Sequence, residues 1–491
     1  MLMNPKMLEV NTRIWLQKLD QPASIRNIPD SFIDDLSSKG FEILWLMGIW
    51  KTSKNLVEKC CLIPEMVAEY VKVLDDWKKE DVIGSPFAID DYVINPELCN
   101  ESDLLEFKKK LNKKGIKLLL DFIPNHFGAD SSLINSYPDI FLQTDKESFL
   151  KDPYTFYEVK NKQNIYVAHG RDPFFPPWTD TAQLNFFDQR TRDFLIEKLN
   201  YILSIADGVR CDMAMLPLNN VFQNTWSGPL NKAGYKKPDT EFWFTAIQKI
   251  KSRNPDFIFL AEVYWDLENQ LQNLGFDFTY DKSLTDKLVG DDIPGIRAHL
   301  NSEREFQLKC IRFIENHDEI RAAKKFGIPK SLAAAVVIST IQGVRFFYDG
   351  QFEGKKIKLP VQLGREPEEK VSKMILKFYN TLLSISNHKI FKIGEWLQLN
   401  PEAVDILDNS YENILTWQWR LKDEYRIIAV NYSGNISRCR LKLNPENAGN
   451  KVTFEDLLTN KIYKRSAKEI INPGLFVELK EYQSHIFSVY L

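Results

Sequence analysis

Eight short apolar segments between residues 12 and 348 limit the folds open to this chain more than any other feature. Each segment is rich in branched and aromatic residues, as buried strands are, and helical spacing fills most of the intervals between them. This alternation implies parallel pairing, because a crossover helix returns the chain to the same edge of the sheet. Eight such strands suffice to close a barrel. The segments are Thr12–Leu16, Glu42–Met47, Ile116–Phe122, Gly208–Cys211, Phe257–Ala261, Phe276–Tyr280, Ile311–Ile314 and Val344–Tyr348.

Two regions do not follow this alternation. Residues 127–185 are rich in Pro, Asp and aromatic residues, and they are too many for a simple loop, which favours an inserted subdomain. Alternating apolar residues from 388 onward predict an antiparallel β domain. The predicted fold is therefore α/β: a TIM barrel (β/α)8 of residues 1–126 and 186–387, an inserted subdomain 127–185 after strand three, and a C-terminal antiparallel β-sandwich domain 388–491.

Charge, hydropathy and cysteine usage exclude several classes of protein. The chain has 64 Lys and Arg against 67 Asp and Glu, so it lacks the basic excess of proteins that bind nucleic acid or anionic membranes. Its apolar stretches fall short of the roughly 20 residues that span a bilayer, and no basic segment followed by an apolar run opens the sequence. Six cysteines show no metal-binding spacing. We therefore expect a cytoplasmic protein with reduced thiols and with neither nucleic acid nor membrane as a partner.

Carboxylates follow four of the predicted strands. Asp121, Asp212, Glu262 and Glu315 each stand at the carboxyl end of an apolar segment, and those ends converge on the face of a barrel that carries active sites. A single acidic residue there could equally cap the following helix. Four together, with histidines and an arginine beside them, favour a catalytic centre. Two carboxylates on opposite sides of a bond are what glycoside hydrolysis requires.

Four segments resemble the four short regions of the α-amylase family, glycoside hydrolase family 13, and they occur in the family's order. The resemblance extends to the eight strands, the insertion after strand three and the C-terminal β domain. The four segments are DFIPNH (Asp121–His126), GVRCDMAM (Gly208–Met215), AEVYW (Ala261–Trp265) and ENHDEIR (Glu315–Arg321).

The resemblance implies a role for each matched residue. Asp212 would be the nucleophile, Glu262 the general acid and then base, and Asp318 the residue that binds sugar hydroxyls and stabilises the transition state. Six further residues would bind or support the substrate: Arg210 beside the nucleophile, His126 and His317 at the sugar next to the cleaved bond, Arg321 near the same site, Asp121 as a structural aspartate, and Phe87 in place of the family's stacking tyrosine.

Calcium is an option that the resemblance raises. Asn125 matches one calcium ligand of the family, but Met215 and Leu216 stand where many members have a substrate-binding lysine and a histidine whose carbonyl group helps to hold the ion. We therefore expect no required cofactor and treat Asn125 as a candidate calcium ligand.

The resemblance implies a retaining hydrolase that cleaves α-glucosidic bonds in α-glucans or maltooligosaccharides through a covalent glycosyl-enzyme intermediate. A transglycosylase of the same family, such as a glucanotransferase or maltosyltransferase, would use the same first half-reaction and remains the alternative. A non-catalytic carbohydrate-binding homologue is less favoured because all three carboxylates are present. The preferred bond, α-1,4 or α-1,6, and endo or exo action stay open.

Several aromatic residues are candidates either for sugar stacking or for packing. Four of them lie in predicted loops or in the insertion: Trp178, Trp226, Tyr264 and Trp265. Trp417 and Trp419 alternate along a predicted strand of the C-terminal domain, and there we expect them to form core.

Overall fold

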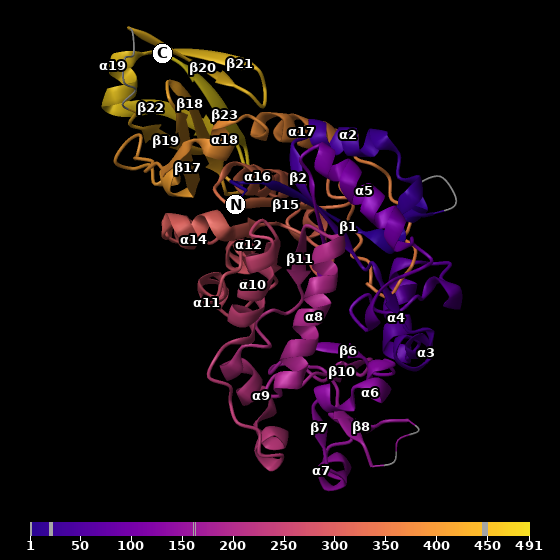
Figure 1. Ribbon diagram of the computed structural model, residues 1–491. Coiled ribbons are helices and arrows are strands. Elements are labelled where there is room, and N and C mark those ends of the chain that lie inside the picture. Colours follow the sequence, from indigo (N-terminus) through magenta and orange to yellow (C-terminus); the bar gives the residue numbers. More distant parts are fainter. Residues whose placement is uncertain (1, 19–22, 161, 163, 444–449) are drawn as a thin grey trace.

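A computed structural model describes residues 2–491 except 19–22, 161, 163 and 444–449. Eight parallel strands close into a barrel in the order β1-β15-β14-β13-β12-β11-β5-β2 (Figure 1). This confirms the predicted TIM barrel. The strands are β1 (Lys6–Asn11), β2 (Phe41–Met47), β5 (Lys117–Phe122), β11 (Gly208–Cys211), β12 (Ile258–Ala261), β13 (Phe278–Tyr280), β14 (Cys310–Arg312) and β15 (Val344–Tyr348).

The first strand is not where the sequence predicts it. Thr12–Leu16 is not a strand: it holds helix α1 (Thr12–Trp15) and the start of a 3-10 turn, and the strand precedes it as β1. Lys6 and Glu9 interrupt the apolar pattern of β1, yet every residue of that strand is buried. Lys6 donates to two backbone carbonyl groups, 2.9 and 2.7 Å away, and Glu9 pairs with a histidine. These two polar residues therefore hid the strand from a search for apolar runs.

Helices surround the barrel. Three of them are α2 (Asp30–Ser38), α5 (Glu101–Lys113) and α8 (Gln189–Ile205). The first two end before Gly40 and Gly115, whose φ angles of 77° and 76° suit glycine. Other helices are α4 (Pro64–Val73), α9 (Asn219–Lys232), α10 (Phe242–Arg253), α11 (Glu268–Asn273), α12 (Lys282–Val289), α13 (Ile293–Leu300), α14 (Arg304–Lys309), α16 (Ile328–Thr340) and α17 (Lys373–Ser386).

The segment between β5 and α8 forms small sheets at the end of the barrel away from the C-terminal domain (Figure 1). One sheet pairs β6 with β10, and a second has the order β7-β9-β8. A further two-stranded sheet pairs β3 with β4, which follow β2 and precede β5 along the chain. Their bounds are β3 (Trp50–Thr52), β4 (Ile89–Ile94), β6 (His126–Gly128), β7 (Gln143–Thr144), β8 (Phe156–Glu158), β9 (Tyr166–Ala168) and β10 (Thr181–Gln183).

The C-terminal domain is antiparallel, as predicted. Its sheets have the orders β16-β17-β18-β23-β20-β21 and β19-β22. Trp417 and Trp419 are buried, which confirms them as core, and both indole N–H groups donate to the carbonyl oxygen of Thr340, the last residue of α16. The strands are β16 (Glu395–Gln398), β17 (Ile414–Leu421), β18 (Glu424–Asn431), β19 (Ser437–Leu441), β20 (Lys451–Asp456), β21 (Lys461–Ser466), β22 (Leu475–Leu479) and β23 (Ser484–Tyr490).

Among the described residues, no helix is both long enough and apolar enough to cross a membrane. All six cysteines are free thiols, and five of them are buried. Cys211, beside Asp212, is one of the buried five, and burial raises the pKa of its thiol. A packing role therefore suits this cysteine better than chemistry.

Candidate active site

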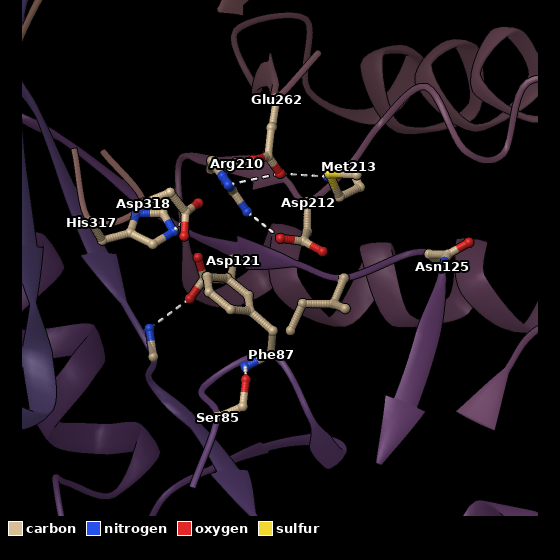
Figure 2. Close-up of polar contacts among 12 residues, drawn as sticks. Ser85, Phe87, Asp121, Asn125, Arg210, Asp212, Met213, Glu262, His317 and Asp318 are labelled. Atoms are coloured by element: carbon tan, nitrogen blue, oxygen red, sulfur yellow. Dashed lines mark hydrogen bonds and ion pairs between the residues drawn. The ribbon is translucent and has the colours of Figure 1, made fainter. Parts of the chain in front are cut away.

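One buried arginine joins the two carboxylates that the sequence places at the reacting bond. Arg210 is fully buried on β11. Its Nη1 lies 2.6 Å from Oδ1 of Asp212, and its Nη2 lies 2.9 Å from Oε2 of Glu262 (Figure 2). Because the guanidinium is planar and rigid, it sets the relative position of both carboxyl groups.

Aromatic rings enclose this arginine. The guanidinium carbon lies 5.0 Å from the ring centroid of Trp45, 5.4 Å from that of Phe87 and 5.8 Å from that of Tyr280. The faces of these rings attract a cation, and their bulk keeps water away from it. With less water present, the ion pairs to both carboxylates are stronger than they would be at the surface.

Glu262 has two further contacts that orient it. The backbone N–H of Met213 donates to its Oε2 at 2.7 Å, and the Tyr264 hydroxyl donates to its Oε1 at 2.9 Å. Met213 has a φ of 42°, an unfavourable value for a side chain of this size. Burial raises the pKa of Glu262 to about 7, against the opposing charge of Arg210. This carboxyl group can therefore hold a proton near neutral pH.

Asp212 differs from Glu262 in what surrounds it. Burial raises the pKa of Asp212, while the charge of Arg210 and the 2.6 Å hydrogen bond from it act in the opposite direction. Two carboxyl groups in unlike surroundings can divide acid and nucleophile roles between them.

Asp318 belongs to a line of three charged side chains. Its side chain is 47% exposed, and its Oδ2 lies 2.9 Å from Nε2 of the buried His317. On the other side of the ring, Nδ1 lies 2.5 Å from Oε1 of Glu9. Desolvation by the surrounding protein acts to raise the pKa of Asp318, but the charge of His317 outweighs it and lowers that pKa well below the usual range. Asp318 is therefore ionised and open to a ligand.

His126 and Phe87 lie in the same region. His126 is buried, its ring centroid is 5.4 Å from that of Trp178, and burial lowers its pKa to about 4, so it is neutral at neutral pH. The half-buried Phe87 has its ring centroid 5.4 Å from that of His317. A neutral imidazole can both donate to and accept from sugar hydroxyls.

Asp121 and Arg321 are engaged by protein groups. Oδ1 of Asp121 accepts from Nε1 of Trp45 at 2.9 Å, and its Oδ2 accepts from the Gly48 N–H at 2.6 Å. Arg321 pairs with Glu315 at 2.6 Å and donates to a backbone carbonyl at 2.8 Å. Both residues therefore support the site through their neighbours, consistent with the structural part expected of Asp121.

The surroundings of Asn125 do not fit a calcium ion. Its Oδ1 accepts a hydrogen bond from Nε2 of Gln183 at 2.9 Å, and its Nδ2 donates to Oε1 of the same residue at 3.2 Å. Calcium favours several carboxylate and carbonyl oxygens, whereas the one amide oxygen that Asn125 could offer is engaged by Gln183. In the described part of the chain, no three His, Cys, Asp or Glu residues gather as metal ligands would.

The sequence does not predict two contacts of the site, that of Glu9 with His317 and that of Tyr264 with Glu262. Glu9 lies in β1, whereas the apolar pattern predicts the first strand at Thr12–Leu16. From the sequence, Tyr264 is a candidate for sugar stacking or for packing, although its position two residues after Glu262 indicates that it could contact this carboxylate. Of the other loop aromatics, Trp226 is buried in α9, and the 36% exposed Trp265 lies against Phe174 with ring centroids 5.1 Å apart.

Fold and site together define a (β/α)8-barrel protein with three clustered carboxylates, an arrangement suited to glycosidase chemistry. Residues 78–373, more than half of the chain, match the family described as alpha amylase, catalytic domain. The chain therefore belongs to the α-amylase family.

Known relatives agree with this assignment. The chain is 26% identical to alpha-amylase 3 of Dictyoglomus thermophilum over 351 residues, which cover 66% of this chain and 64% of that protein. It is 23% identical to a cyclomaltodextrinase of Thermoanaerobacter pseudethanolicus over 60% of this chain and 50% of that one. The chain thus spans less than two thirds of the length of these relatives. A maltogenic alpha-amylase from Thermotoga neapolitana has the same fold, with a TM-score of 0.70, 18% identity and 99% of each chain covered.

Proposed function

We propose that this protein is a retaining glycoside hydrolase that cleaves α-glucosidic bonds in α-glucans or maltooligosaccharides. The observation that carries the proposal is the bridge that Arg210 makes between Asp212 and Glu262, two carboxyl groups in unlike surroundings. The names of the relatives, amylases and a cyclomaltodextrinase, support the substrate class.

In this proposal the ionised Asp212 attacks the anomeric carbon, and a covalent ester forms as the glycosidic bond breaks. Glu262 gives its proton to the leaving oxygen, then takes a proton from the water that hydrolyses the ester. Arg210 keeps Asp212 ionised between these steps. Asp318 accepts hydrogen bonds from sugar hydroxyls, and Phe87 offers a ring face to the sugar.

Product analysis tests the function. The protein is incubated with maltooligosaccharides, starch, pullulan, maltose, trehalose and sucrose, and early products are followed by chromatography and by proton NMR of the anomeric centre. Shorter chains that appear first as the α-anomer are expected. A first product in the β-anomer would contradict retention, and chains longer than the substrate would indicate transfer. Glucan binding without turnover on any substrate would favour a non-catalytic homologue.

Tyr264→Phe is expected to move the alkaline limb of the kcat/KM profile to higher pH by about 0.5–1 unit. The size follows from the loss of one hydrogen bond worth about 1 kcal/mol, since one unit of pKa corresponds to about 1.36 kcal/mol. The Tyr264 hydroxyl donates to Glu262 and so favours its ionised form, which lowers its pKa. Without that hydroxyl the pKa of Glu262 rises above about 7. An acid that acts in its protonated form then keeps its proton to higher pH, and kcat/KM measured against pH shows the change.

Tyr201→Phe is the matched control, because the Tyr201 hydroxyl donates to Glu101 over the same 2.9 Å but on the protein surface. Its pH profile should coincide with that of the wild type. A Tyr264→Phe profile that also coincides, or that moves to lower pH, would contradict the role of this hydroxyl.

We also expect the protein to fold and act without calcium. Excess EDTA should leave the melting temperature within about 1 °C of its original value, because only a ligand bound to the folded state shifts the unfolding equilibrium. The Asn125–Gln183 amide pair supports this expectation. Thermal unfolding in EDTA and in millimolar calcium is the measurement, and a melting temperature that rises with calcium would count against it.

A further inference from the structure

Glu9 is a carboxylate that the chemistry proposed above does not use. It is fully buried on β1, between Trp45 of β2 and Tyr348 of β15 in the strand register. Its Oε1 lies 2.5 Å from Nδ1 of His317, while its buried Oε2 has no hydrogen-bond partner among the described residues. An ionised carboxylate so far from water is costly unless a positive group compensates it.

The imidazole ring of His317 is the group placed to compensate it. In a protonated imidazole both ring nitrogens are donors, and here each of them lies close to a carboxylate oxygen: Nδ1 within hydrogen-bond geometry and Nε2 at an ion-pair distance. Nδ1 lies against Glu9, and Nε2 lies 2.9 Å from Oδ2 of Asp318. A neutral ring has a single N–H and would leave one of the two carboxylates against an unprotonated nitrogen.

Charged groups on neighbouring elements favour the protonated ring as well. Asp121 of β5 and Asp212, which follows β11, both interact with His317 through their charges. Arg210 is a cation and so acts against protonation of the ring, but it packs against Trp45 and Phe87, the same two rings that contact the imidazole. Burial opposes protonation, but Asp318 and Glu9 outweigh it and hold the pKa of His317 well above its usual value.

The positive ring matters because Asp318 has two acidic neighbours. Its charge acts on both Asp212 and Glu262 and raises their pKa values. The same repulsion opposes the ionisation of Asp318 itself. A fixed cation at His317 offsets this repulsion, so that Asp318 can accept hydrogen bonds as a carboxylate.

We propose that Glu9 is a positioning residue that holds His317 as an imidazolium and, through it, keeps Asp318 ionised and directed toward the substrate. This inference rests on the proposed glycosidase function. The contacts run from Glu9 on β1 to His317 and from His317 to Asp318, and of these three side chains only that of Asp318 is substantially exposed.

The test is Glu9→Gln, which keeps the size of the side chain and removes its charge. With histidine labelled by 15N, the His317 ring of the wild type is expected to stay protonated from pH 5 to 8, and in Glu9→Gln it should titrate within that range. The value of kcat/KM should fall roughly tenfold to a hundredfold, the range for a hydrogen bond to a charged group. The alkaline limb should move to lower pH, opposite to the change expected of Tyr264→Phe.

Asp456→Asn is the matched control. Asp456 is a buried carboxylate in the C-terminal domain, and its Oδ2 lies 3.0 Å from Nδ1 of His485, far from the barrel's carboxyl ends. This variant should leave the His317 signals and the pH profile unchanged, and so it controls for the loss of a buried histidine–carboxylate pair in general.

A neutral His317 in the wild type at pH 7 would overturn the proposal, and so would a Glu9→Gln variant whose His317 titration and pH profile match the wild type. If Glu9→Gln fails to fold, the titration of the wild-type ring still decides the charge of His317. If the wild type has no activity on any α-glucan, the proposed function fails, whereas the nitrogen spectra still show whether Glu9 holds the imidazolium.

Discussion

Asp212→Asn is expected to lower kcat on maltooligosaccharides by at least about a thousandfold, as the loss of a nucleophile does in other enzymes. The amide cannot attack the anomeric carbon, so no covalent intermediate forms. The fold should survive, because the amide oxygen can still accept the hydrogen bond from Arg210 and Arg210 keeps its 2.9 Å pair with Glu262. Single-turnover assays and circular dichroism are the measurements.

Asp193→Asn is the control for this substitution. Asp193 lies on α8 with a 54% exposed side chain, 3.8 Å from Lys249, and it has no contact with the site. That variant should retain wild-type turnover. If Asp212→Asn kept more than about a tenth of the wild-type kcat, a loss of less than 1.4 kcal/mol in transition-state stabilisation, Asp212 would not be the nucleophile.

Trp419→Ala is expected to lower the free energy of unfolding by about 3–5 kcal/mol, the usual effect of truncating a buried tryptophan. Trp419 is fully buried where β17 meets α16, and its indole N–H donates to the carbonyl oxygen of Thr340 at 2.6 Å. That carbonyl group is at a helix end, where no further turn of the helix supplies a donor. Urea unfolding followed by circular dichroism measures the loss.

Trp419→Phe separates packing from hydrogen bonding. Phenylalanine keeps most of the ring, and Trp417 still donates to Thr340 at 3.0 Å, so we expect a loss of only about 1–2 kcal/mol. Both variants should keep their activity well below the unfolding transition, because the C-terminal domain does not contribute to the carboxylate cluster. Unchanged urea midpoints for Trp419→Ala would contradict the structural role assigned to this interface.

The strands that the sequence locates best keep at least three consecutive apolar residues. β2, β5, β12 and β15 have such a run because both faces of a barrel strand are buried. The apolar pattern did not locate β1, because two of its six residues, Lys6 and Glu9, are of charged types. Their burial depends on partners more than 30 residues away in the chain. The small sheets between β5 and α8 have strands of two or three residues, too short for a reliable alternation signal.

The residues of the candidate site also fall into those that the sequence places and those that it does not. Residues at the carboxyl ends of strands could be grouped from sequence, since parallel strands bring those ends together whatever the loops do. That reasoning placed Arg210 beside Asp212, two positions apart on one strand face. It did not identify the backbone N–H of Met213 as a donor to Glu262, because that contact depends on the backbone conformation after β11, where Met213 has a φ of 42°.

The sequence by itself determined the barrel class, the β domain and the identity of the clustered carboxylates, because these depend on local periodicity and on the order of residues along the chain. Only the tertiary structure shows the burial and the contacts that shift the pKa values of these groups. The raised pKa values of Glu262 and His317 depend on burial and on contacts with residues such as Glu9 and Asp318, and these contacts exist only after distant strands have packed together.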